Sequence, residues 1–241
     1  MASVLVPPRR HDPEWMDRPG NTMADLAGAL DDIRLVNRFL RGSKILVAAL
    51  RPLLSALPEG ETLHVLDVGT GGADLPLDLV SFARRLGRGI RIVAVDRDPV
   101  TIEYARARTA GTPEIEVRRA DAFALPFPPG SFDVVTASMF LHHFDHDDAV
   151  RLLSGFRRIA RRSVLVNDLR RHRVPWAFIG LAARVTGRHP MFVHDATLSV
   201  LRGFTADELM AAAREAGAAS ATVDRRLPYR LVLTMPGGGG G

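Results

Sequence analysis

The stretch that decides the fold is LHVLDVGTGGADLP, residues 63–76. Its first half is a short apolar run that ends in Asp67, which is typical of a strand buried on both faces of a parallel sheet. Glycines follow at 69 and 71, and a glycine removes the Cβ atom where the backbone must turn tightly beside a ligand. A helix over 74–86 would point its first amide groups at that ligand. The stretch therefore predicts a strand, a ligand-binding loop and a helix.

Strand and helix patterns alternate through the rest of the chain. Further strands are expected at 91–96, 114–120, 132–138, 163–168, 219–225 and 229–234. Helices are expected from the N-cap Asp98 to 109, over 146–160, and from a capping box at Thr205 and Glu208 to 215. Alternation of this kind predicts an α/β fold, a Rossmann-like sheet of seven mostly parallel strands.

Three segments flank or interrupt this expected core of 61–236. Residues 1–60 read as an irregular proline-rich arm followed by lid helices at about 23–40 and 44–57, with Leu26, Ile33 and Phe39 on the lid and Trp15 and Met16 joining it. A helical insertion at about 170–203 would form a cap after the fifth strand. The glycines at 237–241 predict a disordered tail.

Composition limits the partners and the compartment. The chain has 241 residues, a net charge of +5, a single lysine and no cysteine, which excludes disulfides and thiolate metal sites. Nine arginines and one acid lie between 157 and 190, but an arginine-rich, lysine-poor composition also reflects a GC-rich coding sequence, so a nucleic-acid partner is unlikely. The sequence has no apolar run long enough for a membrane span and no signal-peptide pattern. We expect a cytoplasmic protein.

Acidic residues follow the second and third strands. Asp96 ends the strand at 91–96, where a carboxylate can accept hydrogen bonds from both ribose hydroxyls of a nucleoside. Asp121 and Ala122 follow the third strand, within reach of an adenine edge. A dinucleotide site would need a third glycine in the Gly-x-Gly-x-x-Gly pattern, and that position is Asp74. The pattern favours a nucleoside over a pyrophosphate.

Four segments in order, VLDVGTGGADLP, AVDRDPVTIEYAR, RRADAFALPFPPGSFDVVTASMFLHHF and the strand-five segment, resemble the motifs of class I S-adenosylmethionine-dependent methyltransferases, in particular the bacterial small-molecule branch with its quinone-biosynthesis and polyketide-associated enzymes. The likeness covers about residues 62–168. It implies that S-adenosylmethionine is the cofactor. The positions that match the family's cofactor contacts are Asp67, Gly69, Thr70, Gly71, Asp96, Arg97, Asp121, Ala122 and Ser138.

The acceptor side is less clear from the sequence. His142 and His143 follow the fourth strand, where either could deprotonate a phenol or enol, or could serve packing alone. His194 and Asp195 in the inserted region could reach the same pocket. No histidine spacing indicates a metal site. Apolar cap residues could line an acceptor pocket or form the core of the cap: Trp176, Phe178, Ile179, Met191 and Phe192.

The sequence therefore predicts methyl transfer to a small, aromatic or polyketide-like acceptor, with O-methylation ahead of C-methylation. Two alternatives stay open: a methyltransferase for RNA or protein, and a non-catalytic module that binds the cofactor. The segment after the fourth strand, Ser138 to Leu141, is unlike the Asn-Pro-Pro-Tyr element of enzymes that methylate amino groups of nucleobases. The chain could also form a homodimer.

Overall fold

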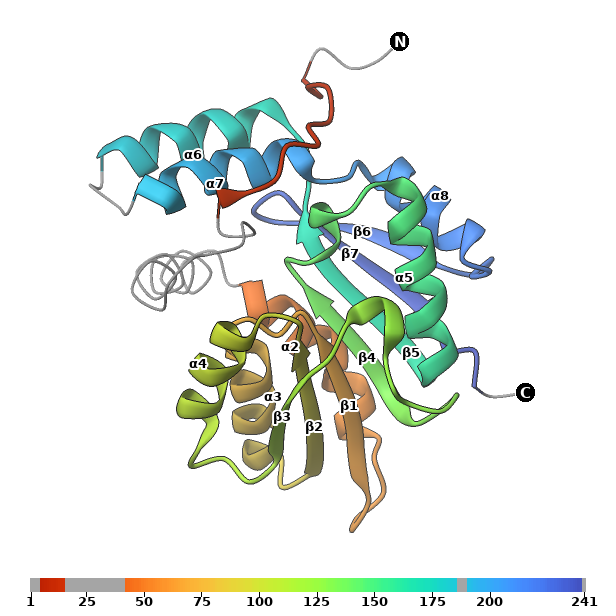
Figure 1. Cartoon of the computed structure of the whole chain (residues 1–241). Coiled ribbons are helices and arrows are strands. Elements are labelled where there is room, and N and C mark those ends of the chain that lie inside the picture. Colours follow the sequence, from red (N-terminus) through yellow and green to blue (C-terminus); the bar gives the residue numbers. More distant parts are fainter. Residues whose placement is uncertain (1–4, 16–41, 186–189, 240–241) are drawn as a thin grey trace.

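The computed structural model describes residues 5–15, 42–185 and 190–239 (Figure 1). The expected helix at 23–40, with Met16, Leu26, Ile33 and Phe39, lies outside the described residues. The seven strands of the sheet are β1 (Thr62–Val68), β2 (Gly89–Asp96), β3 (Ile115–Arg119), β4 (Phe132–Ser138), β5 (Ala160–Leu169), β6 (Thr222–Arg226) and β7 (Arg230–Pro236). The predicted α/β class and the seven-stranded, mostly parallel sheet are confirmed.

The strand order is β3-β2-β1-β4-β5-β7-β6. The first five strands in this order run parallel, while β7 is antiparallel to both of its neighbours. Strands β2 and β3 are added on one side of β1, and β4 and β5 are added on the other side, so the strand order reverses between β1 and β4. In open α/β sheets, ligands bind at such a point, beyond the carboxyl ends of the strands.

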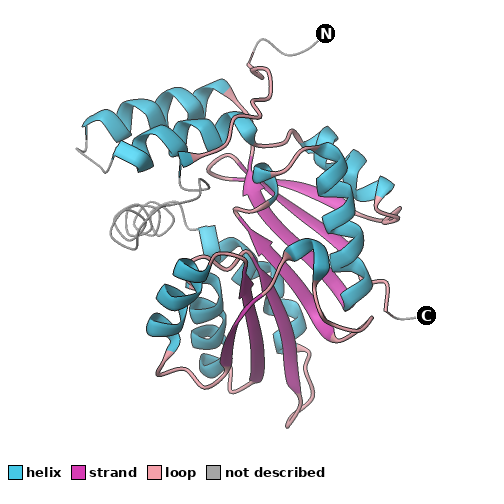
Figure 2. Ribbon diagram, in the orientation of Figure 1, coloured by secondary structure: helices cyan, strands magenta, loops and turns pink. Residues whose placement is uncertain are grey.

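Helices cover both faces of the sheet (Figure 2). They are α2 (Gly42–Ser55), α3 (Asp74–Arg85), α4 (Pro99–Thr109), α5 (His146–Ile159) and α8 (Ala206–Glu215). Strand β1 shows why two layers form: its Leu63 and Val65 pack into a core with α2, α3 and α4, whereas Leu66 and Val68 pack into a second core with α5 and α8. An apolar strand with side chains on alternate faces can be buried only between two helical layers.

Two further helices, α6 (Arg173–Val185) and α7 (Pro190–Arg202), lie side by side beyond the carboxyl edge of the sheet, in the expected position of the inserted segment (Figure 1). The N-terminal arm, residues 5–15, runs along α7. The backbone N–H of Arg10 donates to the carbonyl of Leu201 at 3.2 Å, and the Arg171 guanidinium donates to the carbonyl of Pro7 at 3.0 Å. The arm is therefore tied to the cap and to the end of β5.

Element boundaries differ from expectation at several ends. Strand β5 begins three residues earlier than predicted, at Ala160, and β6 begins at Thr222 rather than 219 because a turn at 217–221 intervenes. In α6, Trp176 is 43% and Phe178 66% exposed, which disfavours, for these two side chains, the alternative that they form the core of the cap.

The beginning of the glycine tail is ordered, contrary to expectation. The N–H groups of Gly237, Gly238 and Gly239 donate to the carbonyls of Arg162, Arg157 and Ala160 at 2.9, 2.7 and 3.2 Å. Glycine is what permits this close approach, since a Cβ on Gly237 would lie 2.4 Å from the carbonyl oxygen of Ala160.

The capping box at the start of α8 gives a test of the fold. The Thr205 hydroxyl accepts from the Glu208 N–H at 3.2 Å, and Glu208 Oε2 accepts from the Thr205 N–H at 2.8 Å. We expect Thr205→Ala to lower the free energy of unfolding by about 1 kcal/mol, because one helix N–H loses its partner. Urea denaturation measures this. The exposed Ser220, changed to alanine, serves as the control and should change stability by less than about 0.5 kcal/mol.

Candidate active site

The loop between β1 and α3 makes the sharp turn that its glycines predict. Gly69 and Gly71 have φ angles of +67° and +52°, and the N–H of Thr70 donates to the carbonyl of Val95 on β2 at 3.0 Å. The ring of Phe140 lies directly on Gly69, where a Cβ would come within 2.2 Å of it. A Cβ on Gly71 would meet no atom within 4 Å, so the described residues leave open space beside the loop there.

Asp67 is a buried carboxyl group at the end of β1. Its Oδ1 accepts a hydrogen bond from the Thr136 hydroxyl on β4 at 2.7 Å. Burial raises the pKa of Asp67 to about 6, against the opposing effect of the Thr136 hydrogen bond. A carboxyl group with a raised pKa gains most from a cation placed beside it, because the cation favours its ionised form.

Asp96 lies one strand away, at the end of β2. Its Oδ2 accepts from the N–H of Gly71 at 3.2 Å, and its Oδ1 accepts from the N–H of Asp98 at 3.2 Å. Burial raises the pKa of this carboxyl group, and the backbone hydrogen bonds oppose that shift. A carboxylate offers about four lone-pair positions. Asp96 therefore keeps acceptor capacity for a ribose hydroxyl.

The other expected cofactor contacts lie around this loop with less definite geometry. Arg97 is exposed, and its carbonyl accepts from Arg119 at 3.0 Å. Asp121 is exposed and caps a short 3₁₀ turn, η2 (Ala122–Ala124), by accepting from the N–H of Phe123 at 2.9 Å. Ser138 ends β4, and its hydroxyl accepts from the Asn167 amide at 3.1 Å. All three follow the carboxyl ends of parallel strands, as the sequence predicts.

These residues fit an adenosyl sulfonium. Its methionine ammonium and sulfonium are cations, and its ribose offers two hydroxyl donors. The site presents the buried carboxyl of Asp67, the spare acceptor capacity of Asp96 one strand away, and open space over Gly71. The site does not fit a pyrophosphate, because the carboxylates of Asp67 and Asp96 would repel its negative charge.

His142 forms a buried pair with Asp168. It lies on the 3₁₀ turn η3 (Leu141–His143) directly after β4, and its Nδ1 is 2.7 Å from Asp168 Oδ1 on β5. The backbone N–H of His142 also donates to Asp168 Oδ2, at 3.0 Å. Burial alone would raise the pKa of Asp168, but the His142 ring and these hydrogen bonds hold it below its usual value. The pair fixes the orientation of the imidazole and leaves Nε2 as its reactive nitrogen.

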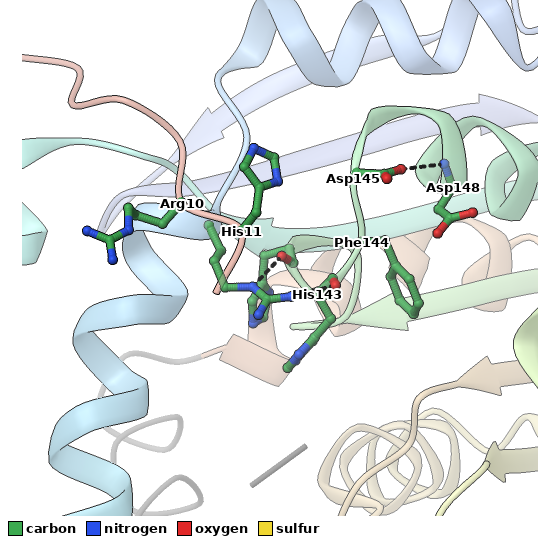
Figure 3. Close-up of a pocket in the computed structure, with 8 residues that line it drawn as sticks. Arg10, His11, His143, Phe144, Asp145 and Asp148 are labelled. Carbon is green, nitrogen blue, oxygen red and sulfur yellow. Dashed lines mark hydrogen bonds between the residues drawn. The ribbon is translucent and has the colours of Figure 1, made fainter. Parts of the chain in front are cut away.

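The N-terminal arm supplies a third group. Glu14 is buried, its Oε1 accepts from the Ser199 hydroxyl at 2.7 Å, and the same oxygen is 3.6 Å from His142 Nε2. His143 is partly buried, with its ring centroid 4.2 Å from that of His142. Figure 3 shows this region, where a pocket of about 230 Å³ is lined by Arg10, His11, His142, His143, Phe144, Asp145, Asp148 and Arg202.

His194 and Asp195 pair with each other, at 2.8 Å between Nδ1 and Oδ1. Asp195 also accepts from the N–H of Trp15 at 2.8 Å, and the Trp15 ring stacks on His194 with centroids 4.1 Å apart. This pair fastens the arm to α7. The contacts give it a structural role in the described residues.

Sequence reasoning missed Asp168, Glu14 and Phe140. Asp168 could have been found, because it lies near the carboxyl end of a parallel strand as Asp67 and Asp96 do. Glu14 and Phe140 give no comparable signal. Glu14 reaches the site only because the arm folds back along α7, and Phe140 covers Gly69 through the path of the loop after β4.

Comparison with known proteins agrees with this geometry. Residues 65–163 match the family described as "Methyltransferase domain". Over 90 residues the chain is 39% identical to demethylmenaquinone methyltransferase from Thermus thermophilus, covering 36% of this chain and 39% of that protein. It is 38% identical over 91 residues to nocamycin O-methyltransferase from Saccharothrix syringae, covering 37% and 31%. The chain thus spans less than half the length of these curated relatives.

Solved structures share the fold over most of the chain. The CMeT domain of the citrinin polyketide synthase superposes on 83% of this chain and 52% of its own length, with a TM-score of 0.61 and 17% identity. A SAM-dependent methyltransferase from Aquifex aeolicus superposes on 79% of this chain and 88% of its own, with a TM-score of 0.56.

Residues 65–163 therefore resemble a methyltransferase domain, and the fold of the chain and the geometry of its glycine loop agree with that likeness. A demethylmenaquinone methyltransferase and the nocamycin O-methyltransferase are among the relatives that part of this chain resembles. The carboxyl groups of Asp67 and Asp96 fit S-adenosylmethionine as the cofactor. In the part of the chain that the structure describes, no helix is both long and apolar enough to cross a membrane.

The raised pKa of Asp67 gives a prediction for stability. The unfolded chain releases this proton near pH 3.8 and the folded chain near pH 6, so the folded state holds more protons between these values. Stability from this group is therefore lost as the pH rises from about 4 to about 6, by up to about 3 kcal/mol, and is constant above that. We expect Asp67→Asn to remove this slope from urea unfolding measured between pH 4 and pH 7. Exposed Asp147, changed to asparagine, should leave the slope as in the wild type; an unchanged slope in Asp67→Asn would contradict the assignment.

Proposed function

We propose that the protein transfers the methyl group of S-adenosylmethionine to a small-molecule acceptor with an acidic O–H or C–H group, a phenol, quinol or enol of aromatic or polyketide type. The observation that carries this is the pairing of a buried His142–Asp168 couple with the Asp67–Asp96 loop at one edge of the sheet. The first group can take a proton from an acceptor. The second can hold a cationic nucleoside.

The cofactor, when bound, supplies an electrophilic methyl group on a sulfonium that an oxygen or carbon nucleophile can attack. The chain's part is orientation and proton removal. Asp67 and Asp96 orient the methionine ammonium and the ribose. Asp168 holds His142 with Nδ1 protonated, so that Nε2 accepts the acceptor's proton. His143, next to it, contributes to the wall of the same pocket.

The buried charges near His142 favour this proton transfer. The proton that Nε2 gains makes the ring a cation, and Asp168 lies 2.7 Å from its other nitrogen while Glu14 lies 3.6 Å from Nε2. Both carboxylates stabilise an imidazolium. A positioned base suits an acceptor whose O–H or C–H proton must be removed and is unnecessary for an amine that already carries a lone pair, so we place O-methylation ahead of C-methylation and both ahead of N-methylation.

An RNA or protein acceptor has weaker support. Several arginines of the basic stretch at 157–190 bind within the chain itself: Arg158 and Arg161 donate to the carbonyls of Phe127 and Gly130, and Arg171 forms an ion pair with Glu208 at 2.6 Å. The ion pair neutralises the charge of Arg171, and the carbonyl contacts occupy hydrogen-bond donors of the other two. Two residues of the arm, Arg10 and His11, also line the pocket at His142 and narrow the space beside it.

Cofactor binding is the first test. We expect Asp96→Ala to weaken S-adenosylmethionine at least tenfold in calorimetry, because hydrogen bonds to a charged acceptor contribute about 1.5–3 kcal/mol each. Asp224, an exposed residue of β6, gives a matched control in Asp224→Ala, which should bind as the wild type does. An unchanged affinity in Asp96→Ala would remove the basis for the nucleoside site.

Methyl transfer is the second test. Labelled S-adenosylmethionine is incubated with a panel of phenols, quinols and polyketide enols. On any acceptor that turns over, we expect His142→Asn to lower kcat by about 10²–10⁴ with cofactor affinity unchanged, as for loss of a general base. His146→Asn, a partly exposed histidine on α5, should keep the wild-type rate. Cofactor binding without turnover on the whole panel would favour the non-catalytic module.

A further inference from the structure

Glu14, His142 and His143 bring three potential metal-ligand atoms into one cluster. One atom from each, a carboxylate oxygen and two imidazole nitrogens, lies within 4.8 Å of the other two. Glu14 and His142 are each only 2% exposed, so this is not a chance meeting of surface side chains. The three come from the arm and from η3, which are far apart in the sequence.

The space between His142 Nε2 and Glu14 Oε1 suits a cation. Nδ1 of His142 is engaged by Asp168, so a neutral ring presents a lone pair at Nε2. Glu14 Oε1 faces that lone pair at 3.6 Å, a separation too long for a hydrogen bond. Two lone pairs facing each other in a buried place repel unless a positive charge, either a proton on Nε2 or a metal ion, lies between them. The donor atoms of a tetrahedral Zn²⁺ site with bonds of about 2.0–2.1 Å stand about 3.3–3.4 Å apart. The observed separation is close to that.

The surroundings match those of a metal site. Asp168 holds the first histidine by its second nitrogen, and the Ser199 hydroxyl holds the carboxylate of Glu14, at 2.7 Å each. Outer contacts of this kind orient the ligands of protein-bound metals. The pocket of about 230 Å³ is lined by both histidines of the cluster.

Arg202 lies beside the cluster, and its guanidinium donates to backbone carbonyls. The Arg202 guanidinium donates to the carbonyl of His142 at 3.1 Å and also to the carbonyls of His143 and Asp12. It therefore joins the backbone of η3 to that of the arm, two residues before Glu14. Its position fixes the ligands relative to each other without consuming the carboxylate.

We propose that Glu14, His142 and His143 bind a divalent transition-metal ion of the Zn²⁺ type, and that this ion inhibits methyl transfer. The ion would bind the Nε2 lone pair of His142 that the proposed function uses as a base, so ion and acceptor proton compete for one atom. The inference rests on the proposed function only for its inhibitory part. Metal binding itself is independent of it.

The test is a titration of the untagged full chain with Co²⁺, followed by visible absorption, and with Zn²⁺ by calorimetry. We expect one ion per chain, and at least about tenfold weaker binding in Glu14→Gln and in His143→Ala. His146→Ala is the control and should bind as the wild type does. Binding of S-adenosylmethionine, measured on each variant, shows that the fold is intact. Absence of saturable binding in the wild type, or equal binding in both ligand variants, would overturn the proposal.

Activity gives the second readout. We expect saturating Zn²⁺ to lower methyl transfer by the wild type at least tenfold, with recovery on addition of a chelator. In His143→Ala and Glu14→Gln, compared with their own metal-free rates, at least about ten times more Zn²⁺ should be needed. A metal that binds at this cluster without lowering the rate would refute the inhibitory part. A wild-type protein that does not bind S-adenosylmethionine would instead count against the proposed function. A failure of the inhibitory part and a failure of the proposed function therefore give different results.

Discussion

Parallel alignment of β1, β2, β4 and β5 is the constraint on which the site depends. Parallel strands end at the same edge of a sheet, so residues at four separate places in the sequence are carried to one place in space. Asp67, Asp96, Ser138 and Asp168 each lie at or near the end of one of these strands. None of them is positioned by its sequence neighbours alone. The apolar runs before them, buried between two helical layers, determine where they stand.

Burial of charge gives these carboxyl groups their different properties. Asp67 is held by a neutral hydroxyl and has a raised pKa, whereas Asp168 is held by an imidazole and has a lowered one, although both are buried. The two pKa values differ because the hydrogen-bond partners of the carboxyl groups differ, not because one group is buried more deeply. One group is poised to receive a cation from a ligand, and the other already has its partner in the chain.

Much of this was readable from the sequence, because periodicity and glycine placement are local signals. The seven strands, the N-cap Asp98 and the capping box at Thr205 follow from short patterns, and the strand-end rule places Asp67, Asp96 and Asp121. Contacts that form only when a distant segment folds back onto the site could not be predicted from the sequence. The return of the arm that buries Glu14 and the ring of Phe140 on Gly69 depend on tertiary packing. The backbone of Gly237–Gly239 is held by hydrogen bonds to the end of α5 and the start of β5, and a rule based on composition cannot describe such contacts.

Arginine guanidinium groups join the arm to η3 through backbone carbonyls rather than through carboxylates. Arg202 donates to carbonyls on both segments, and Arg9 donates to the carbonyls of Arg202 and Phe144, at 2.8 Å each. A carbonyl keeps its acceptor character at every pH and whatever side chain is attached to it. These hydrogen bonds between the arm and η3 are therefore insensitive to pH and to side-chain substitution at the residues that accept them. The arm remains vulnerable to cleavage of the chain between Arg9 and Glu14, which would detach the Arg9 guanidinium from the segment that carries the carboxylate of Glu14.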